Sequence, residues 1–456
     1  MLDPRNSLED LNRLRAASNF LGILNDIKRR PEDAAKELDV SLELINSIIE
    51  GDTDLPQDII EKAIKIWPVN KRDFFIIEDD CPKGIKIMSS KDSEKTSRIM
   101  YRAGKPYYEY RDTAMSKSAP FRPEWILELC NVTDNDSENN SVQWNNGHFL
   151  HQFTYFIGNV NFYYKDKDGK KQTAVMSTGD SMYITPFVPH TFATRSDSKS
   201  KGLILALTYG GKLTGEPQQE LSSMHNLGSE FALDFSSIKS ASGSLLKFNR
   251  KISSISLEEL AKRTDISLKE LESFESSSII PELSQLQKIS AALTINVRDL
   301  LPNDKIENKV IIKNHKDTKI WFYPEKTKSY EFRELASTTA LPFSKSFEVD
   351  LLNSNDSELD LEFGLHQYVY NVGDTPITLN WEINEIKYSE DIYPNDSLYI
   401  KPFIKHSFRG NGKILILRVA GKIPGDSQRE LSIVGKEHTK RAISETMPWF
   451  DKKGKS

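Results

Sequence analysis

The spacing of apolar residues divides the chain into stretches of two kinds, and the first kind predicts helices. From about residue 18 to residue 78, apolar side chains recur three and four positions apart, as in Leu38, Leu42, Ile45, Ile48 and Ile49. This period places them on one face of a helix. Ser41 stands where an N-cap is expected and Gly51 ends the segment. A second stretch, from about 244 to 301, has the same period, with Ser267 at the matching cap position.

The second kind of stretch predicts β-strands. β-Branched and aromatic residues run together at Phe153–Ile157, Val160–Tyr164 and Gly202–Tyr209. Turn-forming pairs, Gly158-Asn159 and Gly179-Asp180, punctuate these runs. Many short strands joined by such turns are typical of a barrel or jelly roll. We therefore expect each helical stretch to be followed by a β-barrel.

The chain also repeats itself. The segment DSMYITPFVPH, from Asp180 to His190, matches DSLYIKPFIKH, from Asp396 to His406, at seven of eleven positions. Shorter matches join residues 150–155 to 365–370, residues 108–111 to 330–333, and residues 34–41 to 260–267. The offsets run from 215 to 226, so we interpret the chain as a tandem duplication.

The predicted fold class is therefore α+β: an all-α domain of the helix-turn-helix type followed by a double-stranded β-helix barrel, written twice. The predicted domains are a helical domain at 1–98, a barrel at 99–216, a second helical domain at 217–305, a second barrel at 306–430 and a C-terminal tail at 431–456.

Composition narrows the class of protein. With 61 Lys and Arg against 66 Asp and Glu, the net charge is −5, which gives no overall basic surface for nucleic acid. No apolar run reaches the roughly 18–20 residues that span a bilayer. The two cysteines, Cys81 and Cys130, cannot form a disulfide framework. We expect a cytoplasmic protein that makes no membrane contact.

The helical pattern from Asp33 to Gly51 resembles the helix-turn-helix of phage repressors, which raises the alternative of a transcription regulator with a sensing barrel. A recognition helix presents Arg, Lys, Asn or Gln to base edges. The segment Ser41–Glu50 carries two acids and no cation, and Ser267–Glu275 carries three glutamates and one lysine. Acidic side chains are repelled by phosphates, so we expect no nucleic-acid binding.

Three polar residues of the first barrel are candidates for a metal site. In a strand, His148 and Gln152 share a face because alternate residues point the same way, and His190 follows the rigid segment 186–189. Two imidazoles, one oxygen donor and open positions form the arrangement that non-haem Fe(II) uses for O2 chemistry. The alternative, hydrogen-bonded core histidines, stays open on spacing alone.

The second copy serves as an internal control. It has Phe363 at the position of His148, Gln367 at that of Gln152 and His406 at that of His190. One imidazole is missing and a phenyl ring takes its position. We therefore predict that the second barrel is degenerate and holds no metal.

With these residues in hand, the sequence resembles the cupin phosphonate oxygenases, a family in which a repressor-like helical domain precedes a metal-binding cupin barrel. The resemblance covers essentially the whole chain. It implies that Asn145, Arg102 and Tyr110 bind the phosphonate and that Lys28, from a helical domain, reaches a cupin site in a catalytic and substrate-binding role. The second copy lacks them: Asp360 takes the position of Asn145, Pro324 that of Arg102, Phe332 that of Tyr110 and Ser254 that of Lys28.

The metal ligands distinguish branches of this family. Its members carry a glutamate either four residues after the first histidine, where this chain has Gln152, or six residues before the second, where it has Ile184. The combination resembles the methylphosphonate-forming branch. It implies Fe(II)- and O2-dependent cleavage of 2-hydroxyethylphosphonate to methylphosphonate and CO2. The alternative within the family gives hydroxymethylphosphonate and formate.

The resemblance also implies a list of cofactors and partners. Fe(II) is the metal, O2 is a co-substrate, and neither 2-oxoglutarate nor NAD(P)H is required. The partner is a small-molecule phosphonate, and homo-oligomerisation stays open. Whether Lys28 acts in its own repeat or in the other one is also left open, as is any role of the second cupin beyond that of a scaffold.

Overall fold

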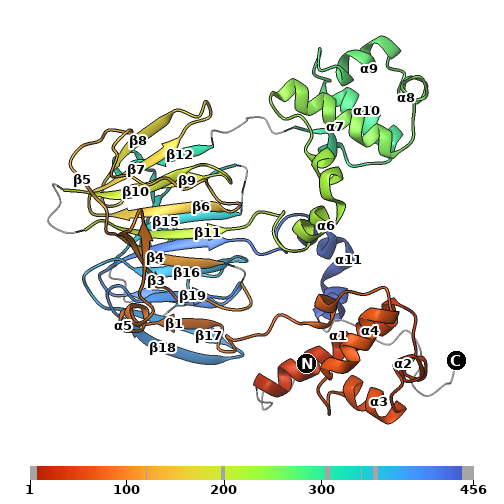
Figure 1. Ribbon diagram of the computed structural model, residues 1–456, viewed down its shortest axis with the longest axis horizontal. Coiled ribbons are helices and arrows are strands. Elements are labelled where there is room, and N and C mark those ends of the chain that lie inside the picture. The colour runs from red at the N-terminus through yellow and green to blue at the C-terminus, as the bar shows by residue number, and fades with distance from the viewer. Residues whose placement is uncertain are drawn as a thin grey trace. The chain divides into compact units, whose positions relative to one another are not determined.

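The computed structural model describes residues 8–119, 121–196, 201–302, 309–339, 341, 343–352 and 358–443. Helices and strands are both abundant (Figure 1), which confirms the mixed helix and sheet class. The chain divides into two compact units, Met1–Gly210 with Val310–Ser456, and Gly211–Lys309. Among the described helices, none combines the length and the apolar character that crossing a membrane requires.

The first helical segment has the predicted period and caps. Its elements are α1 (Leu8–Asp26), α2 (Pro31–Leu38), α3 (Leu42–Glu50), α4 (Gln57–Ile66) and the 3-10 turn η1 (Lys71–Phe74). Ser41 caps α3, because its side chain accepts from the backbone NH of Leu44 at 3.2 Å. Such a cap contributes about 1 kcal/mol. Gly51 ends α3 at φ 80°, in the left-handed region that glycine adopts without strain.

The second helical segment belongs to the other compact unit. Its elements are α6 (Glu216–Met224), η2 (His225–Phe231), α7 (Ile238–Ile252), α8 (Leu257–Thr264), α9 (Leu268–Glu275), α10 (Leu283–Leu293) and η3 (Val297–Leu300). Ser267 caps α9 through a reciprocal capping box with Glu270. The predicted cap is thus confirmed, and α7 to α10 enclose their own apolar core.

A first pair of sheets contains the predicted strands of the first half. The seven-stranded sheet has the order β12-β9-β6-β11-β4-β3-β2 and the four-stranded sheet the order β5-β10-β7-β8. The bounds are β2 Arg98–Arg102, β3 Lys105–Asp112, β4 Arg122–Glu128, β5 Asn131–Val132, β6 His151–Ile157, β7 Val160–Lys165, β8 Lys171–Met176, β9 Ser181–Ile184, β10 His190–Arg195, β11 Leu203–Tyr209 and β12 Val310–Lys313. Both sheets contribute to one core, which includes Phe156, Phe162, Phe192 and Ile204.

A second pair of sheets is built in the same way. The seven-stranded sheet has the order β1-β19-β16-β21-β15-β14-β13 and the smaller sheet the order β18-β17-β20. The bounds are β1 Ile85–Met88, β13 Ile320–Tyr323, β14 Tyr330–Glu334, β15 Ser344–Leu351, β16 His366–Asn371, β17 Ile377–Ile383, β18 Ile386–Ile392, β19 Ser397–Ile400, β20 Lys405–Arg409 and β21 Lys413–Val419. Three further elements are α5 (Ser90–Lys95), η4 (His315–Asp317) and α11 (Asp426–Ile443).

The two sheet pairs exchange one edge strand each. β1 precedes the first pair in sequence but pairs antiparallel with β19 of the second. β12 follows the second helical segment but pairs with β9 of the first. Sequence periodicity does not report which sheet an edge strand joins, so these two pairings were not part of the prediction; the domain boundaries at residues 98 and 306 stay a prediction. Each exchanged strand covers an edge that would otherwise expose unpaired backbone groups.

Part of the segment assigned to a C-terminal tail is helical. Residues 431–443 of the predicted tail 431–456 belong to α11, which is kinked at Gly435. Residues 444–456 lie outside the described residues.

The facing sheets of the two pairs share an apolar cluster that includes Trp125, Tyr155, Tyr370 and Leu415. Within it, the hydroxyl of Tyr155 donates to Oε2 of Glu348 at 2.6 Å. The other oxygen, Oε1, accepts from Lys413 at 2.7 Å. Burial alone raises the pKa of Glu348, but these hydrogen bonds outweigh it and the net pKa is lowered. A buried carboxylate held in this way links the first sheet pair to the second.

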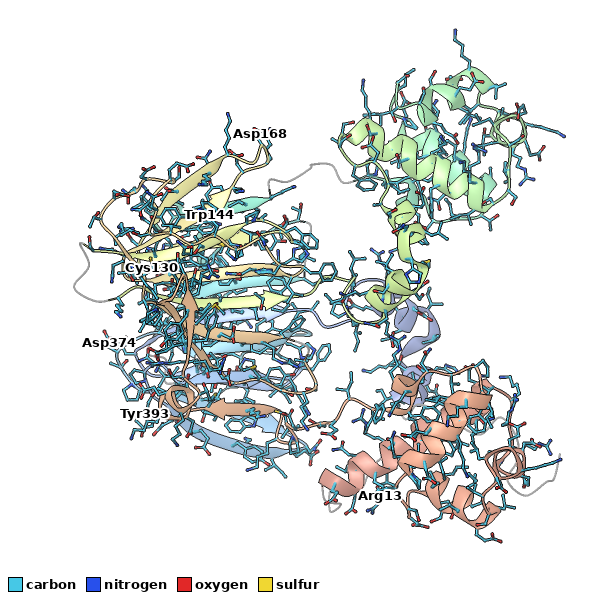
Figure 2. All side chains as sticks on the ribbon, viewed as in Figure 1. Arg13, Cys130, Trp144, Asp168, Asp374 and Tyr393 are labelled. Carbon is cyan, nitrogen blue, oxygen red and sulfur yellow. The ribbon has the colours of Figure 1, made fainter. Side chains whose placement is uncertain are left out.

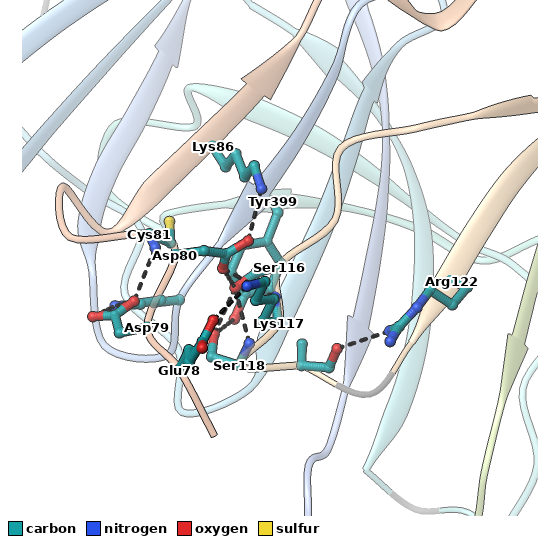
Figure 3. Close-up of polar contacts among 12 residues, drawn as sticks. Glu78, Asp79, Asp80, Cys81, Lys86, Ser116, Lys117, Ser118, Arg122 and Tyr399 are labelled. Carbon is teal, nitrogen blue, oxygen red and sulfur yellow. Dashed lines mark hydrogen bonds and ion pairs between the residues drawn. The ribbon is translucent and has the colours of Figure 1, made fainter. Parts of the chain in front are cut away.

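The segment that precedes β1 is anchored by polar contacts (Figure 3). Asp80 accepts from Lys86 at 2.7 Å and from the hydroxyl of Ser116 at 2.6 Å. Ser118 and Tyr399 of β19 join hydroxyls at 3.2 Å. These contacts hold the segment before β1 against both the first and the second sheet pair.

Candidate metal centre

The three predicted metal ligands come from both sheets of the first pair. Gln152 is the second residue of β6, in the seven-stranded sheet, and His190 is the first residue of β10, in the four-stranded sheet. His148 lies before β6, in an irregular segment. The expectation that His148 and Gln152 share one strand face therefore differs from the structure, because Gly147, at φ 77°, turns the chain just before His148.

The three side chains nevertheless converge. Nε2 of His148 lies 2.9 Å from Oε1 of Gln152. The rings of His148 and His190 have centroids 5.2 Å apart and are nearly perpendicular, at 86°. Gln152 and His190 are buried, at 4% and 3% exposure, and His148 is half-buried. His151 points elsewhere and stacks on Tyr183, as strand alternation predicts.

Hydrogen bonds from the backbone orient both imidazoles. Nδ1 of His148 lies 2.7 Å from the carbonyl oxygen of Leu150, and Nδ1 of His190 lies 2.8 Å from that of Val188. A carbonyl oxygen only accepts, so each Nδ1 carries the proton and each Nε2 presents a lone pair. This second contact of the ring is typical of metal-ligating histidines.

Gln152 is oriented in the same sense. Its Nε2 donates to Oγ1 of Thr154 at 2.9 Å, which directs its Oε1 at His148. Two acceptors, Nε2 of His148 and Oε1 of Gln152, therefore face each other at 2.9 Å. A positive charge between the two atoms, a metal ion or a proton on Nε2, satisfies both of them. The donor set thus fits a metal ion with borderline-soft nitrogen and hard oxygen ligands.

The amide oxygen is essential to this assignment. Across the described ranges, no group of three or more His, Cys, Asp or Glu side chains is arranged to hold a metal. Ile184, where a carboxylate ligand was considered, is fully buried and lies opposite Gln152 in the β6–β9 register. An apolar side chain therefore lies beside the amide.

His190 is prepared as a neutral ligand. Burial lowers its pKa to about 4, an effect that its hydrogen bond to Val188 opposes and that the charges of His148 and Arg102 reinforce. At neutral pH its Nε2 is therefore unprotonated. The influence of Arg102 on this pKa also means that the guanidinium lies within electrostatic range of the site.

Asn145 organises the entrance of the site. Its Oδ1 accepts from the backbone NH groups of Gly147 and His190, at 2.9 Å each, and its Nδ2 lies 3.3 Å from Nε2 of His190. The neighbouring Trp144, labelled in Figure 2, packs on Tyr163 with ring centroids 6.4 Å apart. The segment that carries Asn145 and His148 is thereby fixed, and an amide NH2 group faces the ligands.

Arg102 and Tyr110 meet around Tyr108. Nη1 of Arg102 donates to the carbonyl of Gln143 at 2.7 Å, and its guanidinium lies 4.8 Å from the ring centroid of Tyr108. Tyr110 packs edge-on against the same ring, with centroids 5.9 Å apart. Burial raises the pKa of Tyr110, so its hydroxyl stays protonated. The structure therefore gathers a fixed cation and a neutral hydroxyl donor on one part of the first sheet pair.

Lys28 lies in the turn between α1 and α2, at φ 59°. Its Nζ donates to the carbonyl of Asn25 at 2.9 Å. The role assigned to Lys28 stays a prediction.

Sequence reasoning missed Glu128. It is fully buried opposite Tyr108 in the β3–β4 register, and neither carboxyl oxygen has a hydrogen-bond partner in the described part of the chain. Burial raises its pKa well above the usual value, partly offset by the charge of Arg102. The position is apolar in the second sheet pair, where Leu351 faces Tyr330. The available signal was an acid at position 128, where the second copy has the apolar Leu351.

Comparisons with known proteins agree with this site. No family model matches the chain. It is 63% identical over 442 residues to methylphosphonate synthase from Nitrosopumilus maritimus strain SCM1, covering 97% of this chain and 96% of that protein. A shorter similarity, 29% over 99 residues, covers 22% of this chain and 47% of the (S)-2-hydroxypropylphosphonic acid epoxidase from Streptomyces wedmorensis.

Solved structures give the same picture. Hydroxyethylphosphonate dioxygenase from Streptomyces albus, with its substrate 2-hydroxyethylphosphonate and Fe(II) bound, superposes with a TM-score of 0.90 at 33% identity, covering 97% of this chain and all of that one. A Tyr-to-Phe variant of a hydroxyethylphosphonate dioxygenase superposes with a TM-score of 0.74 at 17% identity, over 95% and 99% of the two chains. This second match shows the shared fold.

Proposed function

Because the chain belongs to the methylphosphonate synthase family of phosphonate oxygenases, we propose that it cleaves the carbon–carbon bond of 2-hydroxyethylphosphonate with Fe(II) and O2. The products are methylphosphonate and CO2. The observation that carries this assignment is the amide oxygen of Gln152, directed at His148 with Ile184 opposite it. A histidine pair with an amide in place of the carboxylate distinguishes this chemistry from that of the carboxylate-bearing relatives.

The electron balance supports the proposed cofactors. One molecule of 2-hydroxyethylphosphonate and one of O2 balance methylphosphonate, CO2 and water, and they also balance hydroxymethylphosphonate and formate. In either case the substrate supplies all the electrons, so no 2-oxoglutarate or NAD(P)H is required.

His148, Gln152 and His190 hold the metal in this proposal. When bound, Fe(II) supplies the sites at which substrate and O2 meet and exchange electrons. The ligands are neutral, so the full 2+ charge stays available to an anionic substrate. Burial keeps His190 unprotonated at neutral pH, and Thr154 keeps the amide oxygen turned toward His148.

The substrate is held by the surrounding cation and donors. Arg102 neutralises the phosphonate through charge-assisted hydrogen bonds, and Tyr110 and the NH2 group of Asn145 add neutral donors. Without them, desolvation of a dianion among these buried aromatic rings would be costly. Lys28 completes the set from the helical segment, in its own repeat or in the other one, as a donor to developing negative charge.

The domain architecture is also part of the proposal. We take each sheet pair as a cupin barrel and each helical segment as a helix-turn-helix domain, in two tandem copies. The matching strand orders of the two seven-stranded sheets support this.

The exposed acidic residues on α3 and α9 support an enzyme that binds no nucleic acid, in contrast to the alternative of a transcription regulator. A cytoplasmic location is part of the same proposal.

The test is a single-turnover experiment. The Fe(II)-loaded protein is incubated with 2-hydroxyethylphosphonate without air, air is admitted, and phosphorus NMR is recorded. Methylphosphonate is the expected product. Hydroxymethylphosphonate would establish the alternative reaction, and unchanged substrate would overturn both. His148→Ala should abolish turnover and metal binding, whereas Phe363→Ala, at the matching position of the second copy, should retain the metal.

A further inference from the structure

The second sheet pair reproduces the backbone of the metal centre. The NH of Phe403 donates to the carbonyl of Phe363 at 2.8 Å, just as the NH of Phe187 donates to that of His148 at 2.8 Å. Gln367 lies opposite Ile400 on β19, as Gln152 lies opposite Ile184 on β9. The ring of His406 is also held like that of His190, through Nδ1 and the carbonyl of Ile404 at 2.8 Å. Position 363 is therefore structurally equivalent to position 148.

A further position differs between the two copies. In the first, the residue opposite Gln152 on β11 is Thr208. In the second, the residue opposite Gln367 on β21 is Arg418. Two substitutions at this place replace polar groups next to the amide: an imidazole has become the phenyl of Phe363, and a hydroxyl has become a guanidinium. A third difference, Val369 at the position of Thr154, removes a hydrogen-bond acceptor for the amide but no proposed ligand.

The guanidinium of Arg418 lies against residues at two of the three positions that correspond to the proposed ligands. Nε of Arg418 donates to Oε1 of Gln367 at 3.1 Å, the atom equivalent to the proposed oxygen ligand of the first centre. Its Cζ lies 3.4 Å from the ring centroid of Phe363, which stands where the first imidazole stood. Nε2 of the remaining histidine, His406, lies 3.5 Å from Nε2 of Gln367. The cation therefore touches the residues at two of the three ligand positions.

Its surroundings are neutral, as they are in the first centre. Arg418 has no ion pair with any described carboxylate, and its Nη2 is buried without a hydrogen-bond partner among the described residues. The rings of Phe347 and Phe332 lie 5.1 and 5.8 Å from its Cζ, which stabilises the charge through cation–π contact. Burial lowers the pKa of Arg418 to about 9, so the group stays charged at neutral pH.

We propose that the second sheet pair is a former metal site in which the guanidinium of Arg418 has replaced the metal ion, and that removing Arg418 and supplying the missing imidazole re-creates a site for a divalent first-row cation. The changes at positions 363 and 418 are linked, because the phenyl of Phe363 lies against the guanidinium of Arg418. An aromatic face attracts a guanidinium, and the ring of Phe363 provides such a face at the position of the missing imidazole. The inference takes its ligand set from the metal proposed for the first centre.

The test is the metal stoichiometry of the full chain with Co(II) as the probe. Wild type should hold one Co(II) per chain and Phe363→His/Arg418→Thr should hold two, measured by elemental analysis after gel filtration and by the ligand-field absorption of Co(II). Phe363→His alone should stay at one, because the guanidinium remains. A folded double variant that holds only one would overturn the proposal.

Adding His148→Ala separates this proposal from the proposed function. In that background the double variant should hold one Co(II), at the new site. If wild type held none while the double variant held one, the proposed first metal centre would fail and the inference about Arg418 would stand.

A second measurement needs no new metal site. Gln367→Glu gives the guanidinium the counter-charge that it lacks, so the Tm should rise by roughly 2–4 °C per kcal/mol gained. The same change in an Arg418→Thr background buries an unpaired carboxylate and should lower the Tm. If Gln367→Glu lowered the Tm of the otherwise wild-type chain, the guanidinium of Arg418 would not form an ion pair with a carboxylate at position 367.

Discussion

At the scale of single residues, the orientation of one amide decides whether the site can hold a metal. Thr154 accepts from Nε2 of Gln152 at 2.9 Å and thereby turns Oε1 toward His148. Thr154→Val keeps the shape but removes the acceptor, so we expect Co(II) affinity to fall roughly 10- to 100-fold. The measurement is a Co(II) titration of the metal-free protein.

The second copy provides the control for this change. The residue two positions after Gln367 is Val369, which is buried and cannot accept a hydrogen bond from the side chain. Val369→Thr should leave Co(II) binding at the first centre unchanged. Equal affinity for Thr154→Val and wild type would mean that packing alone orients Gln152.

Arg102 is expected to act on substrate binding. Its guanidinium supplies the cation near His190, so Arg102→Ala should raise the KM for 2-hydroxyethylphosphonate roughly 10- to 100-fold, the usual loss for a charge-assisted hydrogen bond. Lys105→Ala is the matched control, because Lys105 lies opposite Arg102 in the β2–β3 register but is exposed. An unchanged KM for Arg102→Ala would remove Arg102 from the site.

Residue types and spacing were enough to propose the metal ligands from the sequence, whereas the role of Arg102 came from the family resemblance. The sequence predicted Gln152 and His190 as partners of His148 from residue types and spacing, and the second copy, which lacks one member of the set, served as the control. It could not predict the carbonyl contacts that fix each Nδ1, since they depend on the irregular backbone around Gly147. Glu128 was missed because its position as the last residue of β4, in a strand that also contains Arg122 and Glu124, does not reveal that its side chain is buried.

At the scale of elements, β10 and β20 each carry a buried histidine whose burial lowers its pKa to about 4, from 6.5 for an exposed imidazole. The unfolded chain therefore takes up a proton before the folded chain does. Stability is fully present above pH 6.5 and falls as the pH drops toward 4, by about 1.4 kcal/mol per pH unit for each such group.

His406 is the better of the two to test, because it lies outside the proposed metal centre. Urea unfolding of the metal-free protein at several pH values between 6.5 and 4 should give a shallower pH dependence for His406→Asn than for wild type. His438→Asn, an exposed residue of α11, should leave the slope unchanged. Equal slopes for wild type and His406→Asn would contradict the assigned burial effect.

The sequence predicted which segments form helices and strands more readily than it predicted which strands pair with each other. The caps at Ser41 and Ser267 and the runs that became β6, β7 and β11 are local patterns, which sequence reports directly. The strand β1 was placed in a helical domain, because four residues, three of them apolar, carry no signal of the sheet they join. Its partner β19 lies about 310 residues away in the chain.

At the scale of the whole chain, the exchanged strands make the two sheet pairs depend on each other. Without β12, one edge of β9 would have no hydrogen-bonded neighbouring strand. Without β1, the same would hold for one edge of β19. The apolar cluster that includes Trp125 and Tyr155 is completed by residues of the second pair. Neither sheet pair should therefore be stable alone, even though each has its own internal core.

Fragments of the chain test this dependence. The fragment 99–216, cut at the boundaries that the sequence suggests, lacks β12 and exposes the shared cluster, so we expect it to aggregate or to melt without a cooperative transition by circular dichroism. The fragment 211–309 matches a compact unit and contains a complete core around Leu260, Leu271 and Ile289. It should melt cooperatively as a helical protein. A cooperative, native-like transition for 99–216 would mean that the exchanged strand and the shared cluster contribute little to stability, and that the two sheet pairs are independent.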